Sequence, residues 1–567
     1  MIVPSIQWVL GIVTAVGVVL SSAPAFAASG DSDDPKWCRT CHDDAPFSSA
    51  QFKLSAHKDQ TCRDCHQGFQ FNPHEPVEEA KGDGIDALKK RGFKNPIALN
   101  ACMDCHDSPS DVPGSFPHGK QKDGTKAGLP YCLDCHGDPH EIRLMKGQPA
   151  NVRRVAMNIR CIKCHGDAKK MAPFHLRADI VAAYEHTMHA VKLDLGSPDA
   201  PGCADCHPAH PARDDKKKAA LALGACVKCH AGANPKFKDL ASHKPMTRAD
   251  RPISYFTIKF FAWLTFLTIL GLSLHVLLDV INVVRRAGAP SVPHKQGKEG
   301  AASLDPVLLG MVSEGRIEPT GTVLRFDLNQ RFAHGIMALS FTTLVLTGWP
   351  LSSHGIGASH FLVSLFGGLQ SLGWLHRAAA VGLIIACVYH LAYLGVQMAR
   401  GKLRFSMLPA LKDAKDAVAN ILYFLGMRAE KPAYHRFSYF EKFDYWAVFW
   451  GCVIMVGSGA VRWFPTQVMR FAPTWLYEVC YLAHTDEALL AALAIFVWHF
   501  YNVHLRPAVF PMSWVFLTGR MSMEEHAEEH AAEHEAWLQA AKAKARLAAP
   551  ATVEVKAADE AAEKRAS

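Results

Sequence analysis

One five-residue pattern, Cys-x-x-Cys-His, occurs seven times in the first 230 residues of this 567-residue chain. Two thiols separated by two residues can form thioethers with the vinyl groups of one porphyrin, and the adjacent imidazole can reach its iron. Paired Cys-x-x-Cys units can also make a four-thiolate zinc site, but zinc needs no His after the second Cys. We therefore expect seven covalently attached c-type haems. In chain order the attachment units are Cys38, Cys41 and His42; Cys62, Cys65 and His66; Cys102, Cys105 and His106; Cys132, Cys135 and His136; Cys161, Cys164 and His165; Cys203, Cys206 and His207; and Cys226, Cys229 and His230.

The same region holds nine further histidines that could occupy the second axial position of each iron. They exceed the seven that are needed, and His186 and His189 compete for one role: the nine are His57, His74, His118, His140, His175, His186, His189, His210 and His243. Ligation by two histidines gives low reduction potentials and closed irons, which suits electron transport rather than substrate binding.

The N-terminus predicts export of this region. Residues 7–20 are apolar, and Ala25-Phe26-Ala27 has the small-x-small pattern of a signal-peptidase site, so we expect a signal peptide over residues 1–27. No Lys or Arg precedes the apolar run, and an uncleaved anchor is the alternative. In both cases the haem region is exported, where c-type haems are attached in bacteria.

Composition divides the chain into elements of two kinds. Residues 28–250 are rich in Gly and Pro and lack helical periodicity, which predicts short helices, long loops and a core built largely of porphyrin. The region from 251 to 520 contains five apolar runs of the length that a membrane-spanning helix needs, at 254–284, 332–350, 375–398, 443–463 and 484–505. The expected fold is all-α: a haem-packed, loop-rich multihaem c domain, then a five-helix transmembrane bundle and a charged tail over 521–567.

Charge fixes the expected orientation. The loops 285–333 and 399–442 are rich in Lys and Arg, whereas 351–373 and 464–483 carry only Arg470. Cytoplasmic loops are enriched in Lys and Arg, so we expect the c domain in the periplasm and the tail in the cytoplasm of a bacterial inner membrane. The net charge of +8 is therefore no sign of nucleic-acid binding.

Histidines inside the apolar runs are costly and predict function. His376 and His390 lie fourteen residues apart on one run, and His484 and His499 have a similar spacing on another. Two helices that offer His at two matching depths would hold two stacked b-type haems. Spacing alone does not identify the ligands of the cytoplasmic-side haem. His334, His390 and His504 are all candidates, either in place of His499 or as its partner.

A family resemblance bears on this choice. The stretch Arg331-Phe332-Ala333-His334 through Leu346-Thr347-Gly348, with His376-Arg377, His484 and Trp498-His499-Phe500-Tyr501, resembles the dihaem cytochrome b subunits of formate dehydrogenases and nickel-iron hydrogenases over residues 325–510. The resemblance implies His334 paired with His499 and His376 paired with His484. The 484-to-499 separation is one residue longer than we expect for that family, and His390 is an additional membrane histidine, so a His390–His499 pair is the alternative. The whole layout resembles the membrane quinol dehydrogenases of bacteria that transfer electrons outside the cell.

In the resembled family the quinone lies beside the cytoplasmic-side haem. Polar residues expected there could relay protons or could simply anchor helices at the interface: His435, Glu441, Lys442, Asp444, Tyr445 and His504. In the tail, Ser522 begins a capping-box pattern, and His526, His530 and His534 share one helical face. That face could bind a metal, or the tail could be a solvated cytoplasmic helix.

These features favour a quinol dehydrogenase that passes electrons from menaquinol or ubiquinol through two b haems and seven c haems to a periplasmic cytochrome or oxidoreductase. Two alternatives are open. The chain could be the membrane anchor and relay of a larger periplasmic oxidoreductase, with electrons running inward to quinone. It could also be a catalytic multihaem reductase in which one c haem keeps an open iron. No molybdopterin, iron–sulfur or flavin motif is evident.

Overall fold

The computed structural model describes residues 49–61, 105, 135–138, 141–142, 147–207, 223–240, 243–287, 317, 321–506 and 509–548. Contacts divide the chain into two compact units, residues 1–148 and 149–567. In the first unit the structure describes the short helix α2 (Ser49–Phe52) with the segment after it, and the short stretches at 105, 135–138, 141–142 and 147–148.

Several predicted haem-binding residues lie outside the described residues, as does the predicted signal peptide. From the attachment units they are Cys38, Cys41, His42, Cys62, Cys65, His66, Cys102, His106 and Cys132, and from the expected distal ligands His74, His118, His140 and His210. The structure does describe Cys105, Cys135 and His136, together with the whole of the last three units. Haem attachment stays a prediction from the sequence at all seven units.

Short helices build the N-terminal part of the second unit, as expected for a haem-attachment region. They are α7 (Ala150–His165), α8 (Ala168–Met171), η2 (Ala172–Phe174), α9 (Ile180–Glu185), α10 (Met188–Asp194), α11 (Cys203–Cys206), α12 (Leu223–Val227) and α13 (Lys236–Leu240). Helix α7 is the exception, with 16 residues.

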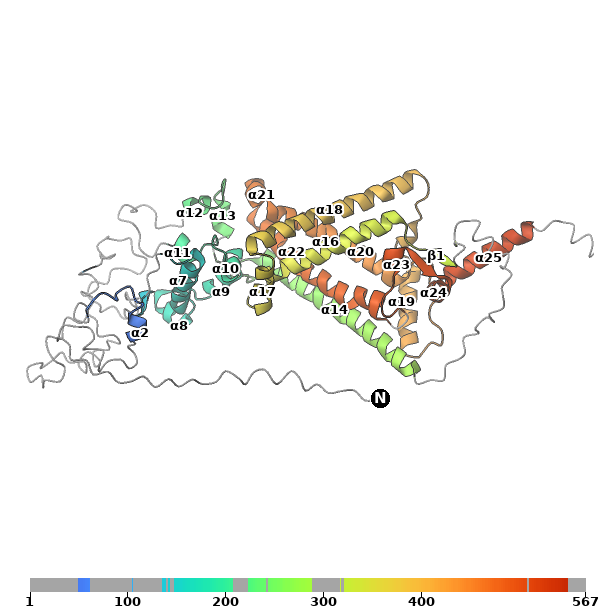
Figure 1. Cartoon of the computed structure of the whole chain (residues 1–567), viewed down its shortest axis with the longest axis horizontal. Coiled ribbons are helices and arrows are strands. Elements are labelled where there is room, and N and C mark those ends of the chain that lie inside the picture. The colour runs from blue at the N-terminus through green and yellow to red at the C-terminus, as the bar shows by residue number, and fades with distance from the viewer. Residues whose placement is uncertain are drawn as a thin grey trace, which may run out of the picture. The chain divides into compact units, whose positions relative to one another are not determined.

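Five long helices follow and form one bundle (Figure 1). They are α14 (Pro252–Ala287), α16 (Leu328–Ser352), α18 (Leu369–Ala399), α20 (Tyr439–Trp463) and α22 (Thr474–Ala494), which continues through the π-helical turns η4 (Ile495–His499) and η5 (Tyr501–Leu505). Even 25 residues extend ~38 Å in a helix, more than the ~30 Å hydrocarbon core of a bilayer. The predicted five membrane-length apolar helices are therefore confirmed.

The sequence explains where two of these helices begin. Asp327 caps α16 by accepting from the Gln330 amide, and Ser438 caps α20 in the same way with Glu441. Both are capping boxes, in which the third helical residue returns the hydrogen bond to the cap. Helix makes up 71% of the described residues and strand 2%, which confirms the all-helical expectation apart from one antiparallel pair, β1 (Thr322–Leu324) with β2 (Arg520–Ser522).

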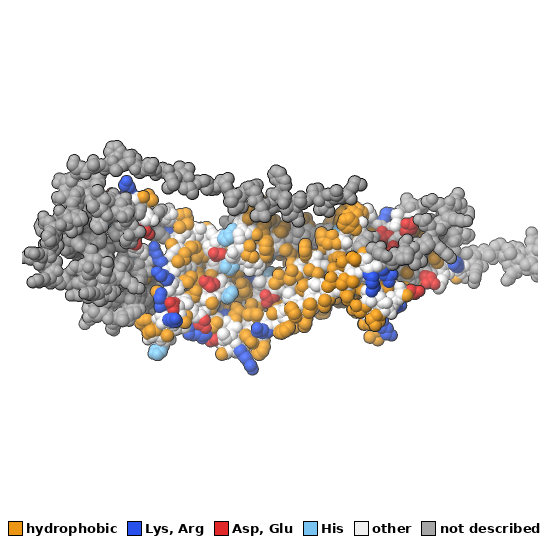
Figure 2. All heavy atoms as spheres, turned by 90° about the horizontal axis from the view of Figure 1, so that it is seen from below, with side chains coloured by type: hydrophobic (Ala, Val, Ile, Leu, Met, Phe, Trp, Pro, Cys, Tyr) orange, Lys and Arg blue, Asp and Glu red, His pale blue; other side chains and the backbone are white. Residues whose placement is uncertain are grey.

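The helices pack in two connected groups. Helices α16 and α18 contact each other most extensively, while α14 and α20 both pack on α22. Apolar side chains remain exposed along the bundle and cover its surface in Figure 2, with Leu339 at 73% and Phe496 at 73% exposed. So large an exposed apolar surface is what a helix bundle in lipid requires.

Shorter helices lie at the two ends of the bundle. The helices α17 (Gly357–Leu365) and α21 (Pro465–Phe471) lie at the end that adjoins the haem-attachment helices, called here the motif end. The other end, the tail end, carries α19 (Leu411–Phe424), η3 (Phe405–Met407), α23 (Val515–Thr518), α24 (Met523–Glu529) and α25 (Ala531–Ala548).

The haem-attachment helices of the second unit pack directly on the motif end. Asn234 donates to the Met469 carbonyl at 2.8 Å, and Lys236 donates to the Ala472 carbonyl at 2.8 Å. Arg251 pairs with Glu478 at 2.9 Å, and both side chains are almost buried. Residues 149–250, which composition assigns to a separate c domain, thus share one compact unit with the membrane-length helices.

The tail differs from the expected solvated helix. His526 and Glu529 of α24 are buried, and Glu529 pairs with Arg506 at 3.0 Å and with Lys431 at 3.5 Å. Ser522 caps α24 by accepting from the Glu525 amide, as its sequence pattern predicts. The charges of α24 therefore hold it against the bundle instead of keeping it in solvent.

Candidate cofactor sites

Two membrane histidines, His376 on α18 and His484 on α22, are held in the same way. The Nδ1 atom of His376 lies 2.8 Å from the Thr347 hydroxyl, and that of His484 lies 3.0 Å from the Ser458 hydroxyl. A glycine follows each hydroxyl residue, Gly348 after Thr347 and Gly459 after Ser458. A Cβ atom at Gly348 would lie only 3.3 Å from the His376 ring, and one at Gly459 only 3.2 Å from the His484 ring. The equivalent neighbours come from two different helices, α16 and α20.

These contacts fix the tautomer of both histidines. The Thr347 hydroxyl donates to the Thr343 carbonyl at 2.7 Å, and the Ser458 hydroxyl donates to the Ile454 carbonyl at 2.6 Å. A hydroxyl has one proton, so each must accept from the imidazole Nδ1–H. The unprotonated Nε2 is then the nitrogen that can bind a metal, oriented by a hydrogen bond on the far side of the ring.

A cluster of cations lies beside this pair. Arg462 is within electrostatic range of both His376 and His484, and Lys192 of α10 lies within range of Arg462 and Arg377. In the part of the chain that the structure describes, these cations form no salt bridge with an acidic side chain. Burial, and then the two guanidinium groups, lower the pKa of Lys192. Unpaired cations at this position suit the propionate carboxylates of a haem.

At the tail end, His499 is oriented by a carboxylate. Its Nδ1 atom lies 3.1 Å from Asp444 Oδ2, which again leaves Nε2 for a metal. His334 and His504 are both within electrostatic range of His499, and their rings lie 6.0 Å and 6.3 Å from that of Phe516.

His390 is placed differently. Its Nε2 atom lies 3.0 Å from the Tyr445 hydroxyl, and its ring meets the Tyr445 ring edge-on. The nitrogen that would bind a metal therefore already has a protein partner. This contact distinguishes His390 from His334, and the pairing of His499 with either of them stays a prediction.

The segment between His484 and His499, which is one residue longer than the resemblance leads us to expect, includes a π-helical turn. A π turn closes its hydrogen bond over five residues instead of four and so takes up one residue without a break in the helix. The turn η4 ends at His499 itself, and η5 follows at once. A π turn that ends at His499 is a place where one extra residue fits within a continuous helix.

The expected quinone residues have separate roles. Glu441 accepts from the Ser438 amide at 2.7 Å and so completes the capping box of α20. Lys442 pairs with Asp413 at 2.9 Å. Tyr445 contacts His390, and the backbone carbonyl of His435 meets His530 Nδ1 at 2.8 Å. The structure does not bring these side chains to one common point.

Two pairs of imidazole rings in the haem-attachment helices have the spacing of axial ligands. The ring centres lie 6.1 Å apart in His189 and His230, and 6.4 Å apart in His207 and His243. A metal–nitrogen bond of about 2 Å, with the ring centre about 1 Å beyond the nitrogen, places two axial imidazoles about 6 Å apart. His186 is exposed and lies in neither pair.

Burial keeps these imidazoles neutral, which is the form that binds iron. It lowers the pKa of His189 to about 4, with a contribution from His230. Burial likewise lowers the pKa of His207, His230 and His243. The buried Nδ1 atom of His243 has no hydrogen-bond partner in the described part of the chain.

The last three attachment units are neighbours in space. The thiols of Cys161 and Cys203, from the fifth and sixth units, hydrogen-bond each other. Cys206 lies close to Cys226, which joins the sixth unit to the seventh. The fifth, sixth and seventh units therefore lie next to one another in chain order.

The third and fourth attachment units are described only in part. Cys105 of the third unit is exposed at a turn, whereas Cys135 of the fourth is half-buried and stands with the exposed His136 in a helical turn. A helical turn at Cys135 and His136 matches α11, which carries both cysteines of the sixth unit. The partners Cys102, His106 and Cys132 lie outside the described residues.

Two further predicted ligands have distinct settings. His175 adopts a left-handed backbone conformation with φ of 54°, as does His243 with φ of 49°. Such conformations are uncommon outside glycine and concentrate at functional sites. In the compact unit of residues 1–148, the His57 amide donates to Ser55 Oγ at 3.1 Å.

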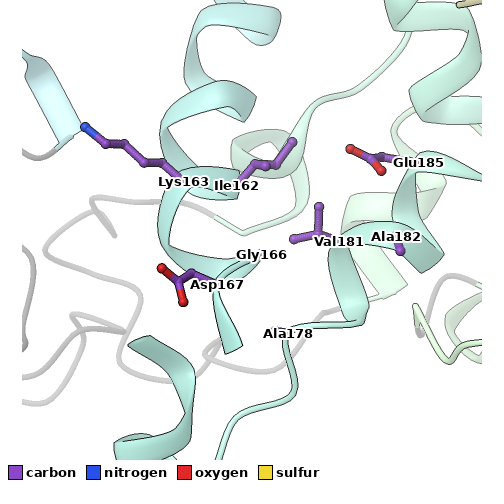
Figure 3. Close-up of a pocket in the computed structure, with 8 residues that line it drawn as sticks. All are labelled: Ile162, Lys163, Gly166, Asp167, Ala178, Val181, Ala182 and Glu185. Carbon is purple, nitrogen blue, oxygen red and sulfur yellow. The ribbon is translucent and has the colours of Figure 1, made fainter. Parts of the chain in front are cut away.

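A cavity of about 430 Å³ adjoins the fifth attachment unit (Figure 3). Its lining combines the two residues between Cys161 and Cys164 with residues of and near α9: Ile162, Lys163, Gly166, Asp167, Ala178, Val181, Ala182 and Glu185. Figure 3 shows Lys163 extending away from α9. The cavity thus lies beside the residues that would hold the fifth haem.

Two of the three tail histidines have structural contacts. His526 stacks on Trp537 and lies 3.2 Å from Glu533, while His530 contacts the carbonyl of His435. Among the described residues, no three His, Cys, Asp or Glu side chains are grouped so as to hold a metal ion. The possible metal site on this face is therefore not formed. A haem iron needs only two axial imidazoles, so this result does not bear on the histidine pairs.

Sequence reasoning missed two ionisable residues of the first span, His275 and Asp279. The signal was available, since an ionisable side chain inside a membrane span is a functional candidate. His275 contacts Tyr439, and Asp279 accepts from the Tyr501 hydroxyl at 2.9 Å.

Comparison with known proteins returned no match, either to a family model or to a curated protein.

Proposed function

We propose that this chain is a membrane quinol dehydrogenase that holds two b haems and seven c haems and delivers electrons from menaquinol or ubiquinol to a periplasmic acceptor. The resemblance of residues 325–510 to dihaem cytochrome b subunits supports the proposal, as do the seven attachment units. In the proposed orientation the motif end faces the periplasm and the tail end faces the cytoplasm of a bacterial inner membrane.

The hydroxyl-oriented pair His376 and His484 carries the proposal. Two histidines on different helices present the same tautomer through the same device, a hydroxyl whose own proton is engaged elsewhere. A single membrane histidine could serve helix packing alone, but packing does not require this duplication. Haem, when bound, supplies one-electron chemistry at an iron whose two axial positions are filled by imidazoles.

The other residues of the proposed electron route lie at the two ends of the bundle. Asp444 orients His499 at the tail end, where His334 lies within range of it. Arg462, Arg377 and Lys192 supply positive charge between His376 and the His189–His230 pair, since Lys192 is within range of His230 as well. The seventh attachment unit is thus the one that adjoins the membrane-embedded pair at the motif end.

The test replaces His484 by Leu in the full-length protein. One extractable haem should be lost, the covalent haems should remain attached, and quinol should no longer reduce them although dithionite still does. His390→Leu is the matched control, because it removes a membrane histidine whose Nε2 is engaged by Tyr445, and it should retain both extractable haems. Normal quinol reduction of the covalent haems in His484→Leu would place quinol oxidation at the periplasmic face instead.

A further inference from the structure

A polar cluster lies within the membrane helices on the side of η4 that faces α14, and we call it the His275 cluster. It comprises His275 of α14, Asn420 of α19, Tyr439 of α20 and Trp498 of η4. His275 Nε2 lies 2.5 Å from the Tyr439 hydroxyl, and Asn420 donates to the same hydroxyl at 3.0 Å. Three elements, α14, α19 and α20, therefore share one hydrogen-bonded group, and the Trp498 ring of η4 lies against it.

Aromatic rings enclose the imidazole of His275. The Trp498 ring lies 4.7 Å from it and the Phe424 ring 5.2 Å, both edge-on. An imidazole enclosed by aromatic rings inside a membrane bundle is costly unless its polar atoms have a use.

Two polar atoms of the cluster have no partner. Asn420 and Trp498 are each only 3% exposed, yet Asn420 Oδ1 and Trp498 Nε1 make no hydrogen bond within the described part of the chain. Leaving such a group unsatisfied costs about 1–3 kcal/mol, so buried polar atoms nearly always have partners. One atom is an acceptor and the other a donor, and a hydroxyl group can satisfy both.

A second acid–base group lies one helical turn away. Asp279 of α14 accepts from the Tyr501 hydroxyl at 2.9 Å. It is within electrostatic range of Arg506 and Lys431, which both pair with Glu529 at the tail end. His275 and Asp279 therefore form the beginning of a route from the membrane interior to the tail end.

The cluster also adjoins the tail-end histidines. Trp498 directly precedes His499, whose ring is turned toward Asp444 on α20. On the opposite side, the apolar residues of α14 around the cluster face outward, with Leu274 at 49% and Leu277 at 53% exposed. A head group bound at the cluster would lie beside the residue next to His499, and an apolar tail would suit the lipid-facing surface of α14.

We propose that the His275 cluster binds the head group of quinol, with one hydroxyl between Asn420 Oδ1 and Trp498 Nε1. The inference rests on the proposed function and locates its substrate. Oxidation breaks both O–H bonds of the quinol and yields quinone, two electrons and two protons. The electrons leave singly to ferric haem, the oxidant in the proposed function. The protons are taken up by His275 and Asp279 and pass toward the tail end.

The test measures binding of the quinol analogue 2-heptyl-4-hydroxyquinoline N-oxide by fluorescence quenching in the purified, haem-loaded full-length protein. Asn420→Leu, a change of nearly equal volume, should weaken binding about tenfold, the loss expected for one buried hydrogen bond. His275→Phe should weaken it at least as much and raise the KM for quinol. Haem content and the dithionite-reduced spectrum should be unchanged. Tyr423→Phe is the control, because Tyr423 shares α19 but lies under Arg286.

Two results would overturn the inference. One is wild-type affinity in Asn420→Leu with intact haem content. The other is loss of binding in Tyr445→Phe alone, which would place quinol beside His390. If His275→Phe loses haem, Asn420→Leu decides the question. A wild-type protein that neither binds the analogue nor accepts electrons from quinol would instead refute the proposed function.

Discussion

At the scale of single residues, the sequence predicts the membrane histidines but not what orients them. His376 and His484 are conspicuous because an imidazole is rare in an apolar run. Thr347 and Ser458 are ordinary in a membrane helix, and their role depends on contacts between residues 29 and 26 positions apart. A hydroxyl residue followed by Gly, once on each of two different spans, was the available signal.

Axial ligation in the haem-attachment helices gives a prediction at the same scale. His189→Ala should convert the haem of Cys226 and Cys229 from low spin to high spin, because the 6.1 Å pair with His230 loses one member. Electron paramagnetic resonance of the oxidised protein should show one new high-spin iron. His186→Ala is the matched control on the neighbouring position and should leave every iron low-spin. If His186→Ala instead produced the high-spin signal, the ring spacing would be a poor guide to ligation.

At the scale of elements, apolar run length predicts the five long helices, while their irregularities escape it. Each helix extends beyond its apolar run, because caps such as Asp327 and Ser438 lie in polar sequence. The π turns η4 and η5 have no compositional signature. The only signal in the sequence was the separation of His484 and His499, which is one residue longer than the resemblance leads us to expect.

That accommodation can be tested by deletion. Removal of Phe496, which is 73% exposed and lies within η4, should allow the π turn to relax to an α turn and leave His499 in place. The tail-end haem should be retained, as measured by extraction and by the reduced α-band. Removal of Val453, 52% exposed on the regular helix α20, should rotate Ser458 relative to Asp444 by ~100°. The Val453 deletion should lose haem. Equal losses of haem in both deletions would show that η4 cannot accommodate the removal of one residue.

The docked tail gives a pH-dependent prediction. Burial alone would raise the pKa of Glu529, but Arg506 and Lys431 outweigh it and lower the pKa below its usual value of 4.5. A carboxyl with a lowered folded-state pKa contributes stability above its unfolded pKa and loses it as pH falls through the folded value. We therefore expect α24 to stay docked at neutral pH and to be released only below about pH 4.5.

Limited proteolysis at residues 531–548 measures that release. Glu529→Gln should increase cleavage at pH 7, since removing one member of a buried ion pair costs on the order of 3 kcal/mol, and should weaken the dependence on acid. Glu535→Gln is the control, because among the described residues Glu535 accepts only from Gln539, within α25 itself. Acid release unchanged in Glu529→Gln would assign the docking to the apolar contacts of α24 and α25.

At the scale of the whole molecule, composition places a boundary near residue 250, whereas contacts join residues 149–567. Composition detects the change from polar to apolar sequence but not the pairing of distant segments. Asn234 and Met469 are 235 residues apart, and Lys236 and Ala472 are 236 apart. Such contacts place the seventh attachment unit against the membrane-length helices, and no local pattern predicts them.

The haem inventory tests the whole arrangement at once. A pyridine haemochrome assay, with acid–acetone extraction to separate covalent from extractable haem, should return about seven c haems and two b haems per chain, because seven units and two histidine pairs each hold one. His376→Leu and His334→Leu should each remove one extractable haem and leave the covalent number unchanged. His360→Leu, on α17 outside the five long helices, should leave both numbers unchanged. A wild-type protein without extractable haem would mean that the membrane histidines serve helix packing, and the electron route through the bundle would have to be abandoned.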